Sequence, residues 1–286
     1  MKLVRYADQS GNSLGVVKND GVIDLAKHWP ALRDDMIDLI KMWPDIASHL
    51  PSLVNNSAPD VALGDIRLLA PVSKPGKILA IGLNYADHIN ETGQQTPPHQ
   101  IWFTKAVTSI NGPFDPIELP MASQQVDYEA ELVVIIGQRC KHVSKERAAE
   151  VVFGYCAGND VSVRDWQLRT TQWVLGKSFD THAPIGPWIV TPDEVGDPHV
   201  LGIRCQVNGE QRQSSNTRHL IFDVFAQIAH LSSVMTLEPG DMLFTGTPGG
   251  VGLAMNPPRW LKSGDKVRVE IDRIGAIEAV MRPEAL

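Results

Sequence analysis

The sequence contains few cysteines and no long apolar run. Its three cysteines are Cys140, Cys156 and Cys205, and no two of them form a CxxC pair. An odd number of cysteines without a recognisable secretory leader favours a reducing compartment, and we expect all three thiols to be small buried groups. No segment approaches the ~20 apolar residues that a membrane-spanning helix needs. The sequence therefore predicts a cytoplasmic protein without a membrane partner.

Basic charge is also scarce. The chain has 26 lysines and arginines against 33 aspartates and glutamates, and the two signs are interspersed. A surface that binds duplex nucleic acid needs a basic stripe, and none is visible, so we expect no nucleic-acid partner. A local group of Arg and Lys can still hold a small anion at this net charge. A small-molecule substrate is the better prediction.

Nucleotide-binding motifs are absent as well. The glycine-rich segment 245–252 has neither the Gly-Lys-Ser/Thr ending of a phosphate-binding loop nor a GxGxxG pattern. Its backbone could still approach a small anion closely, with Thr247 as a hydroxyl donor. The alternative is an ordinary turn.

What the sequence does contain is a succession of short apolar runs separated by turn residues. Asp20-Gly21 between two such runs predicts a hairpin, and residues 32–50 have helical periodicity. Residues 51–71 are rich in Asn, Pro, Asp and Gly and read as a linker. We therefore predict a small N-terminal β-rich domain at 1–70 and a second domain at 71–286. Because strands prevail and no βαβ alternation is visible, the fold class is mainly β within α+β.

The most informative residues are acidic. Glu129 and Glu131 lie two apart where a run of strand-forming residues begins, so a strand points both to one face. Two carboxylates entering a buried strand are costly unless a cation lies between them. Arg or Lys partners, or a solvated edge, would also account for them. Asp160 would complete an open, all-oxygen site that favours Mg²⁺ or Mn²⁺ over zinc, although alone it could be a helix cap.

A second candidate group is the pair His88 and Glu91. One helical turn separates them, so a helix places the carboxylate beside the imidazole, where it would orient a general base. With nine histidines in the chain, a structural role is the alternative. The polar segment 92–100 that follows is either a lid hinged near Gly93 or a surface loop.

Three further polar residues follow Asp160. Arg164 and Gln167 are spaced for one helix face, and Lys177 lies between apolar segments. Beside a metal, such groups would bind a substrate carboxylate or a developing enolate. Each could instead be a solvated side chain.

Together these segments resemble the fumarylacetoacetate hydrolase family, in its bacterial two-domain form. The resemblance covers the chain from about residue 71 to its end. It rests on five segments in order, at 82–88, 127–132, 159–167, 176–180 and 244–252, which read GLNYADH, DYEAEL, NDVSVRDWQ, GKSFD and FTGTPGGVG.

The resemblance implies a mixed β-sandwich roll with a small N-terminal β-domain, and a homodimer. It implies one Mg²⁺ or Mn²⁺ per subunit on Glu129, Glu131 and Asp160. It assigns catalysis to His88, Glu91 and Lys177. It places the remaining candidates around the substrate, namely Arg164, Gln167, Thr247 and Tyr85.

The implied reaction is hydrolysis of a C–C bond in a 2,4-dioxo acid. The substrate would be an acylpyruvate or a sugar-derived 2,4-diketo-3-deoxy acid, such as the rhamnonate or fuconate derivative, and a 2-oxo acid such as pyruvate would be released. The same enolate chemistry would serve an oxaloacetate-type decarboxylase or an isomerase. A metal-binding module without activity is the third alternative, against which His88, Glu91 and Lys177 argue.

Overall fold

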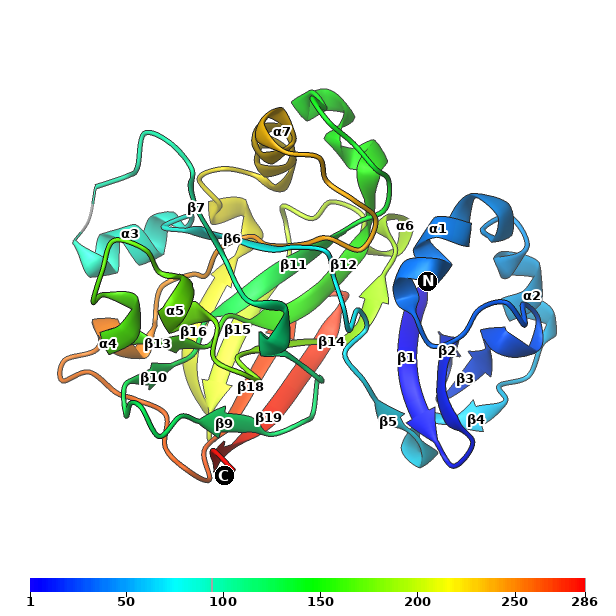
Figure 1. Ribbon diagram of the computed structural model, residues 1–286, viewed down its shortest axis with the longest axis horizontal. Helices are drawn as coiled ribbons and strands as arrows, with labels where there is room; N and C mark the ends of the chain where they lie inside the picture. The colour runs from blue at the N-terminus through cyan, green and yellow to red at the C-terminus, as the bar shows by residue number, and fades with distance from the viewer. Residues whose placement is uncertain (94, 286) are drawn as a thin grey trace.

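The computed structural model describes residues 1–93 and 95–285. Its first part, on the right of Figure 1, is an antiparallel set of strands covered by two helices. The strands are β1 (Lys2–Asp8), β2 (Gly11–Lys18), β3 (Gly21–Asp24), β4 (Val61–Ala62) and β5 (Arg67–Leu68). The helices are α1 (Met36–Ile46) and α2 (Leu50–Asn56). The prediction of a linker at 51–71 was wrong for α2, which begins with a proline in its first turn.

These strands belong to the same sheet as the centre of the molecule, because β1 pairs antiparallel with β14. The sheet order is β4-β3-β2-β1-β14-β12-β11-β17-β6-β7. Beyond β1 the sheet continues with β14 (Ala183–Val190), β12 (Val152–Asn159), β11 (Ala130–Ile136), β17 (Met242–Phe244), β6 (Ile78–Gly82) and the edge strand β7 (Ile101–Thr104). The division into domains at residues 70 and 71 stays a prediction.

A second sheet packs against the first and makes the sandwich. Its order is β16 (Glu210–Asn216), β15 (Gly202–Val207), β18 (Lys266–Ile271), β19 (Gly275–Pro283) and β9 (Ile117–Leu119). Strand β11 is buried on both faces, as its apolar run predicts. Leu132 and Val134 join the core between the sheets, whereas Val133 and Ile135 join a second core that includes α1.

The remaining elements are mostly short. They are α3 (Ala86–Thr92), α4 (Arg164–Gln167), α5 (Val174–Lys177), α6 (Pro192–Val195), α7 (Val224–Val234), β8 (Ile110–Asn111), β10 (Val126–Asp127) and β13 (Ser162–Val163). Among them β8 pairs with β14, and β10 pairs with β13 in a small third sheet. Residues Lys145–Val151 form a 3₁₀ helix. The architecture consists mostly of sheet with some helices. This confirms the predicted fold class, mainly β within α+β. In Figure 1, α3, α4 and α5 lie on the left, away from the N-terminal strands.

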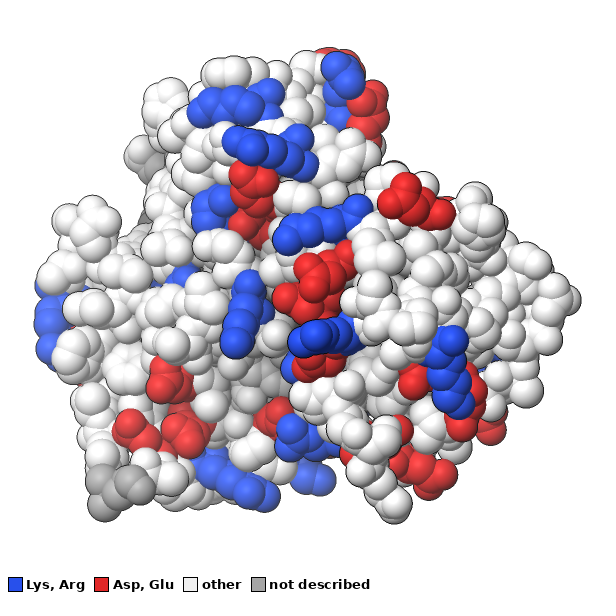
Figure 2. Space-filling view, turned by 45° about the vertical axis from the view of Figure 1, so that its right-hand side comes forward, with Lys and Arg blue, Asp and Glu red and all other residues white. Residues whose placement is uncertain are grey.

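Two expectations from composition can be compared with the structure. All three cysteines are free and buried, as predicted. Among the described helices, none is both long and apolar enough to cross a bilayer. On the face seen in Figure 2, basic and acidic side chains alternate, and no broad basic stripe crosses that face.

Candidate active site and metal centre

The three predicted carboxylates converge because β11 and β12 are antiparallel neighbours. Glu131 lies opposite Gly158, and the Asp160 amide donates to the Glu129 carbonyl at 2.8 Å. The start of β11 and the end of β12 therefore meet at one edge. One oxygen from each of Glu129, Glu131 and Asp160 lies within 4.8 Å of the others, and all three residues are buried. This is a group that could hold a metal ion.

Two basic side chains neutralise Glu129. Lys177 Nζ donates to Glu129 Oε2 at 2.6 Å and to Asp160 Oδ2 at 2.7 Å. Arg164 Nη2 lies 2.7 Å from Glu129 Oε1. Burial alone would raise the pKa of Glu129, but Lys177 and Arg164 outweigh it and lower that pKa to about 2. Glu129 therefore stays ionised throughout the physiological range.

Glu131 has a different environment. It has no ion pair within the described part of the chain, and the hydrogen bond to its Oε2 comes from the Gly246 amide at 2.7 Å. Burial, followed by the charges of Asp160 and Glu129, raises the pKa of Glu131 well above its usual value. A buried carboxylate beside two others, without a cation of its own, is what a divalent cation would stabilise. The donor set is all oxygen, which fits Mg²⁺ or Mn²⁺.

Lys105 is a residue that sequence reasoning missed. It follows β7, is fully buried, and donates from Nζ to Asp160 Oδ1 at 2.6 Å. It also contacts the main-chain carbonyls of Val161 and Lys177. Burial lowers the pKa of Lys105, and the charge of Asp160 opposes that shift. Lys105 thus ties one candidate metal ligand to the segment that carries Lys177. Nothing in the local sequence around Lys105 signals this contact, because Asp160 is 55 residues away.

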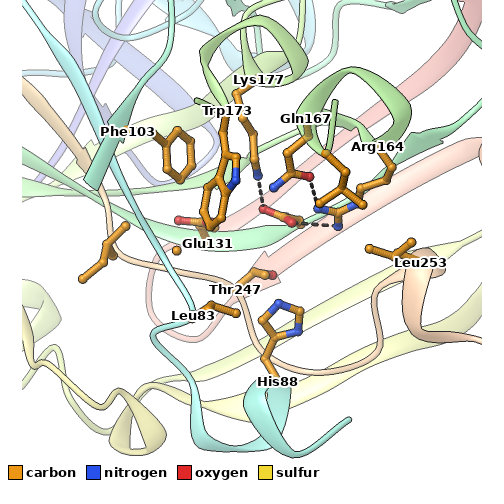
Figure 3. Close-up of a pocket in the computed structure, with 14 residues that line it drawn as sticks. Leu83, His88, Phe103, Glu131, Arg164, Gln167, Trp173, Lys177, Thr247 and Leu253 are labelled. Atoms are coloured by element: carbon orange, nitrogen blue, oxygen red, sulfur yellow. Dashed lines mark hydrogen bonds and ion pairs between the residues drawn. The ribbon is translucent and has the colours of Figure 1, made fainter. Parts of the chain in front are cut away.

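His88 and Glu91 lie on α3 and form the predicted pair. His88 Nδ1 is 2.8 Å from Glu91 Oε1, while Glu91 Oε2 accepts from the Gly250 amide at 2.7 Å. The glycine-rich segment thus fixes the carboxylate, and the carboxylate orients the imidazole. Figure 3 shows His88 across the cavity from Lys177 and Gln167. Of the segment 92–100 predicted as a lid or loop, Gln94 lies outside the described residues, and Gly93 ends α3 in the left-handed region at φ 66°.

The remaining candidates occupy different places. Arg164 and Gln167 lie on α4, where Arg164 Nη1 donates to Gln167 Oε1 at 2.8 Å. Thr247 lines the cavity, and its hydroxyl accepts from Gln213 Nε2 at 2.8 Å. Tyr85 does not line the cavity. It is buried, and its hydroxyl has no hydrogen-bond partner in the described chain.

Seven of the candidate residues border one cavity of about 80 Å³, namely His88, Glu129, Glu131, Arg164, Gln167, Lys177 and Thr247. A single water molecule needs roughly 10–15 Å³ of such space, so the cavity has room for a small ligand. One part of its lining is polar and holds the candidate residues (Figure 3). The rest we call the apolar wall, which consists of Ile81, Leu83, Phe103, Leu168, Trp173 and Leu253.

Comparison with known proteins identifies the class. Residues 77–282 match the model of the fumarylacetoacetate (FAA) hydrolase C-terminal family. The chain belongs to this family.

Its relatives are enzymes with different names. The mitochondrial oxaloacetate tautomerase fahd2 of Xenopus laevis is 44% identical over 97% of this chain and 89% of its own length. Maleylpyruvate hydrolase of Sphingobium sp. SYK-6, solved with manganese(II) and pyruvate, is 35% identical with a TM-score of 0.83 and full coverage of both chains. A 5-carboxymethyl-2-hydroxymuconate delta-isomerase of Mycobacterium smegmatis is 35% identical with a TM-score of 0.79, again with full coverage of both.

Proposed function

We propose that the chain is a Mg²⁺- or Mn²⁺-dependent hydrolase that cleaves a C–C bond in a 2,4-dioxo acid and releases pyruvate or a related 2-oxo acid. The observation that carries the proposal is that His88, oriented by Glu91, lines the same small cavity as Glu129 and Glu131, two of the three clustered carboxylates. A general base opposite a cation site is the arrangement that proton transfer next to a carbonyl group requires. The complex of maleylpyruvate hydrolase with manganese and pyruvate supports the class of ligand.

Each residue has a definite task in this proposal. Bound between Glu129, Glu131 and Asp160, the metal would act as a Lewis acid toward the substrate oxygens. Gln167 and Thr247 position the carboxylate end of the substrate. Glu91 holds His88 through Nδ1, so proton transfer would involve Nε2.

The reaction balances as a hydrolysis. His88 removes a proton from water as the water oxygen attacks the C4 carbonyl of the 2,4-dioxo acid. The C3–C4 bond then breaks, its electron pair stays on C3 as an enolate, and C4 leaves as a carboxylic acid. Lys177, whose pKa Asp160 and Glu129 raise against the effect of burial, stays charged and stabilises the enolate. Protonation of C3 yields the 2-oxo acid.

A second candidate is keto–enol tautomerisation of oxaloacetate. It is favoured by the 44% identity to an oxaloacetate tautomerase over nearly the whole chain. The same His88–Glu91 pair would move one proton between C3 and an oxygen, and no water would be consumed.

One set of assays separates the candidates. Purified protein with Mg²⁺ or Mn²⁺ is given acetylpyruvate, a 2,4-dioxo-3-deoxy sugar acid and oxaloacetate, and the products are identified. We expect pyruvate and acetate from acetylpyruvate. If the enol absorbance of oxaloacetate decays faster with enzyme while neither dioxo acid is consumed, the protein is a tautomerase and the hydrolase proposal is wrong. Formation of pyruvate and CO₂ from oxaloacetate alone would indicate a decarboxylase. His88→Ala should abolish hydrolysis.

Assembly, location and domain organisation are part of the same proposal. We infer a homodimer that works in the cytoplasm, with residues 1–70 as a small domain and 71–286 as the catalytic one. The three free thiols fit a reducing compartment, and several relatives are named mitochondrial. Light scattering of the full chain would report the oligomeric state.

A further inference from the structure

Trp173 and Phe103 are the two aromatic members of the apolar wall, and together they form one side of the cavity. In Figure 3 both rings lie on the opposite side of the cavity from Arg164 and Leu253. Their ring centroids are 5.5 Å apart at an interplanar angle of 61°, an edge-to-face contact. Phe103 is anchored in β7, where it pairs with Ala80 of β6. The pair is therefore attached to the rigid sheet.

The indole of Trp173 is held from behind by Gly82. A Cβ placed on Gly82 would come within 2.3 Å of Trp173 Cζ3, so only glycine leaves room for the ring at this position. Gly82 is the last residue of β6 and itself lines the cavity. The ring is thus fixed by the backbone of one strand and the side chain of the next. A wall supported in this way can exclude a substituent by its shape.

We propose that Trp173, backed by Phe103, is a specificity-determining residue that limits the substrate to a 2-oxo acid with a short, apolar substituent. This rests on the proposed function and selects the small acylpyruvates from its two substrate classes. Among the side chains of the apolar wall, the indole N–H of Trp173 is the one group with which a substrate hydroxyl could form a hydrogen bond. Hydroxyls of a sugar-derived acid would lose their hydrogen bonds to water there without equivalent replacements. A long acyl chain would collide with the indole.

Substitution at position 173 leaves the neighbouring catalytic group in place. Trp173 precedes α5, and its main-chain carbonyl accepts from the Lys177 amide at 3.2 Å, a contact that does not involve the indole. Phe103 is a poorer choice for mutation, because Lys177 Nζ lies 5.0 Å from the centroid of its ring. Leu175 provides a matched control: it lies on α5, but it is 60% exposed and does not line the cavity.

The test measures selectivity for chain length. Values of kcat/KM for acetylpyruvate and hexanoylpyruvate are compared in the wild type and in Trp173→Ala, Trp173→Leu, Trp173→Phe and Leu175→Ala. Since one methylene in an apolar pocket changes discrimination by roughly 10–200-fold, Trp173→Ala should shift the ratio toward hexanoylpyruvate by about tenfold or more. Trp173→Leu should shift it less. Trp173→Phe and Leu175→Ala should keep the wild-type ratio.

A binding measurement separates this inference from the proposed reaction. Calorimetry with the Mn²⁺-loaded protein compares pyruvate with 2-oxooctanoate in the same variants, and we expect Trp173→Ala to tighten binding of the longer acid. If the long acid gains affinity while no acylpyruvate is hydrolysed by any variant, the wall assignment stands and the hydrolase proposal fails. The inference is overturned if acetylpyruvate is hydrolysed but Trp173→Ala and Trp173→Leu keep two wild-type values: the kcat/KM ratio of the two acylpyruvates and the affinity ratio of the two 2-oxo acids. Should Trp173→Ala not fold, Trp173→Leu decides alone.

Discussion

The substitution Glu131→Gln tests the metal site without an activity assay, because its effect should change sign with the metal. One oxygen of Glu131 lies within 4.8 Å of oxygens of both Glu129 and Asp160. At an effective dielectric constant of about 20, two unit charges at that distance repel by about 3 kcal/mol. The nearby basic side chains offset part of this. Because the raised pKa of Glu131 lets the wild type relieve this repulsion by taking up a proton, we expect the neutral variant to be at least as stable as the wild type when metal is removed with a chelator, and more stable by up to about 3 kcal/mol at a pH where Glu131 is ionised.

In the presence of metal the order reverses. A ligand at about 100 times its Kd stabilises the folded state by about 2.7 kcal/mol. That gain corresponds to a rise in Tm of roughly 5–10 °C at about 2–4 °C per kcal/mol, the scale for large domains. Glu131→Gln removes one charged ligand, so the same Mn²⁺ concentration should raise its Tm much less.

The assay is thermal unfolding with chelator and across a Mn²⁺ titration, with calorimetry for affinity. Glu150→Gln is the matched control, because Glu150 is exposed and pairs with Arg147 at the surface. Glu150→Gln should change neither the stability without metal nor the response of the Tm to Mn²⁺. A Glu131→Gln protein that is less stable than the wild type without metal, or that has the wild-type response to Mn²⁺, would refute the assignment.

Three other substitutions address the surrounding groups. Glu91→Gln should lower kcat by about 10²-fold or more and leave Mn²⁺ affinity unchanged by calorimetry, since Glu91 contacts His88 and Gly250 rather than the carboxylates; an equal loss of both would contradict its role. Lys105→Met should destabilise the protein by about 3–5 kcal/mol, with Mn²⁺ restoring part of the Tm, because a buried partner of Asp160 is lost; an unchanged Tm would show that the pair contributes little. Burial lowers the pKa of His182 from 6.5 to about 3. Between these two pH values the unfolded chain therefore binds a proton that the folded chain does not. As the pH falls below 6.5, this group should lower the free energy of unfolding by about 1.4 kcal/mol per pH unit. His182→Gln should lose that part of the acid sensitivity. Urea unfolding of the wild type and the variant at pH 7 and pH 5 would measure this, and an equal loss of stability in both proteins would exclude the role of His182.

The parts of the site that depend on local spacing could be predicted from the sequence. Glu131 lies in β11 and Glu129 lies one residue before it, so the two are two apart along extended chain, and His88 and Glu91 are one helical turn apart on α3. Each pair can therefore be recognised from a local period. The apolar run of β11 likewise indicated a strand buried on both faces.

Contacts between distant segments could not be predicted in this way. Lys105 meets Asp160, and Trp173 packs on Gly82, only because the tertiary fold brings these distant segments together. Neither partner has a pattern in its own neighbourhood that points to the other. Helix α2 was missed for a different reason: its sequence, LPSLVNN, has the composition of a turn, and a proline is acceptable only because it stands in the first helical turn.

The charges around the cavity explain why Glu131 is the decisive residue. Four carboxylates and three basic side chains form the buried cluster, namely Asp127, Glu129, Glu131 and Asp160 with Lys105, Arg164 and Lys177. With all seven groups charged the sum is −1, and Glu131 is the carboxylate outside the ion pairs that the described residues make. Because its pKa is raised well above the usual value, Glu131 is also the member of the cluster that takes up a proton when no cation is present, and the sum is then zero. A divalent cation that displaces this proton changes the sum from 0 to +1, which one substrate carboxylate then neutralises. We therefore expect metal to bind before substrate, with Glu131 exchanging its proton for the metal.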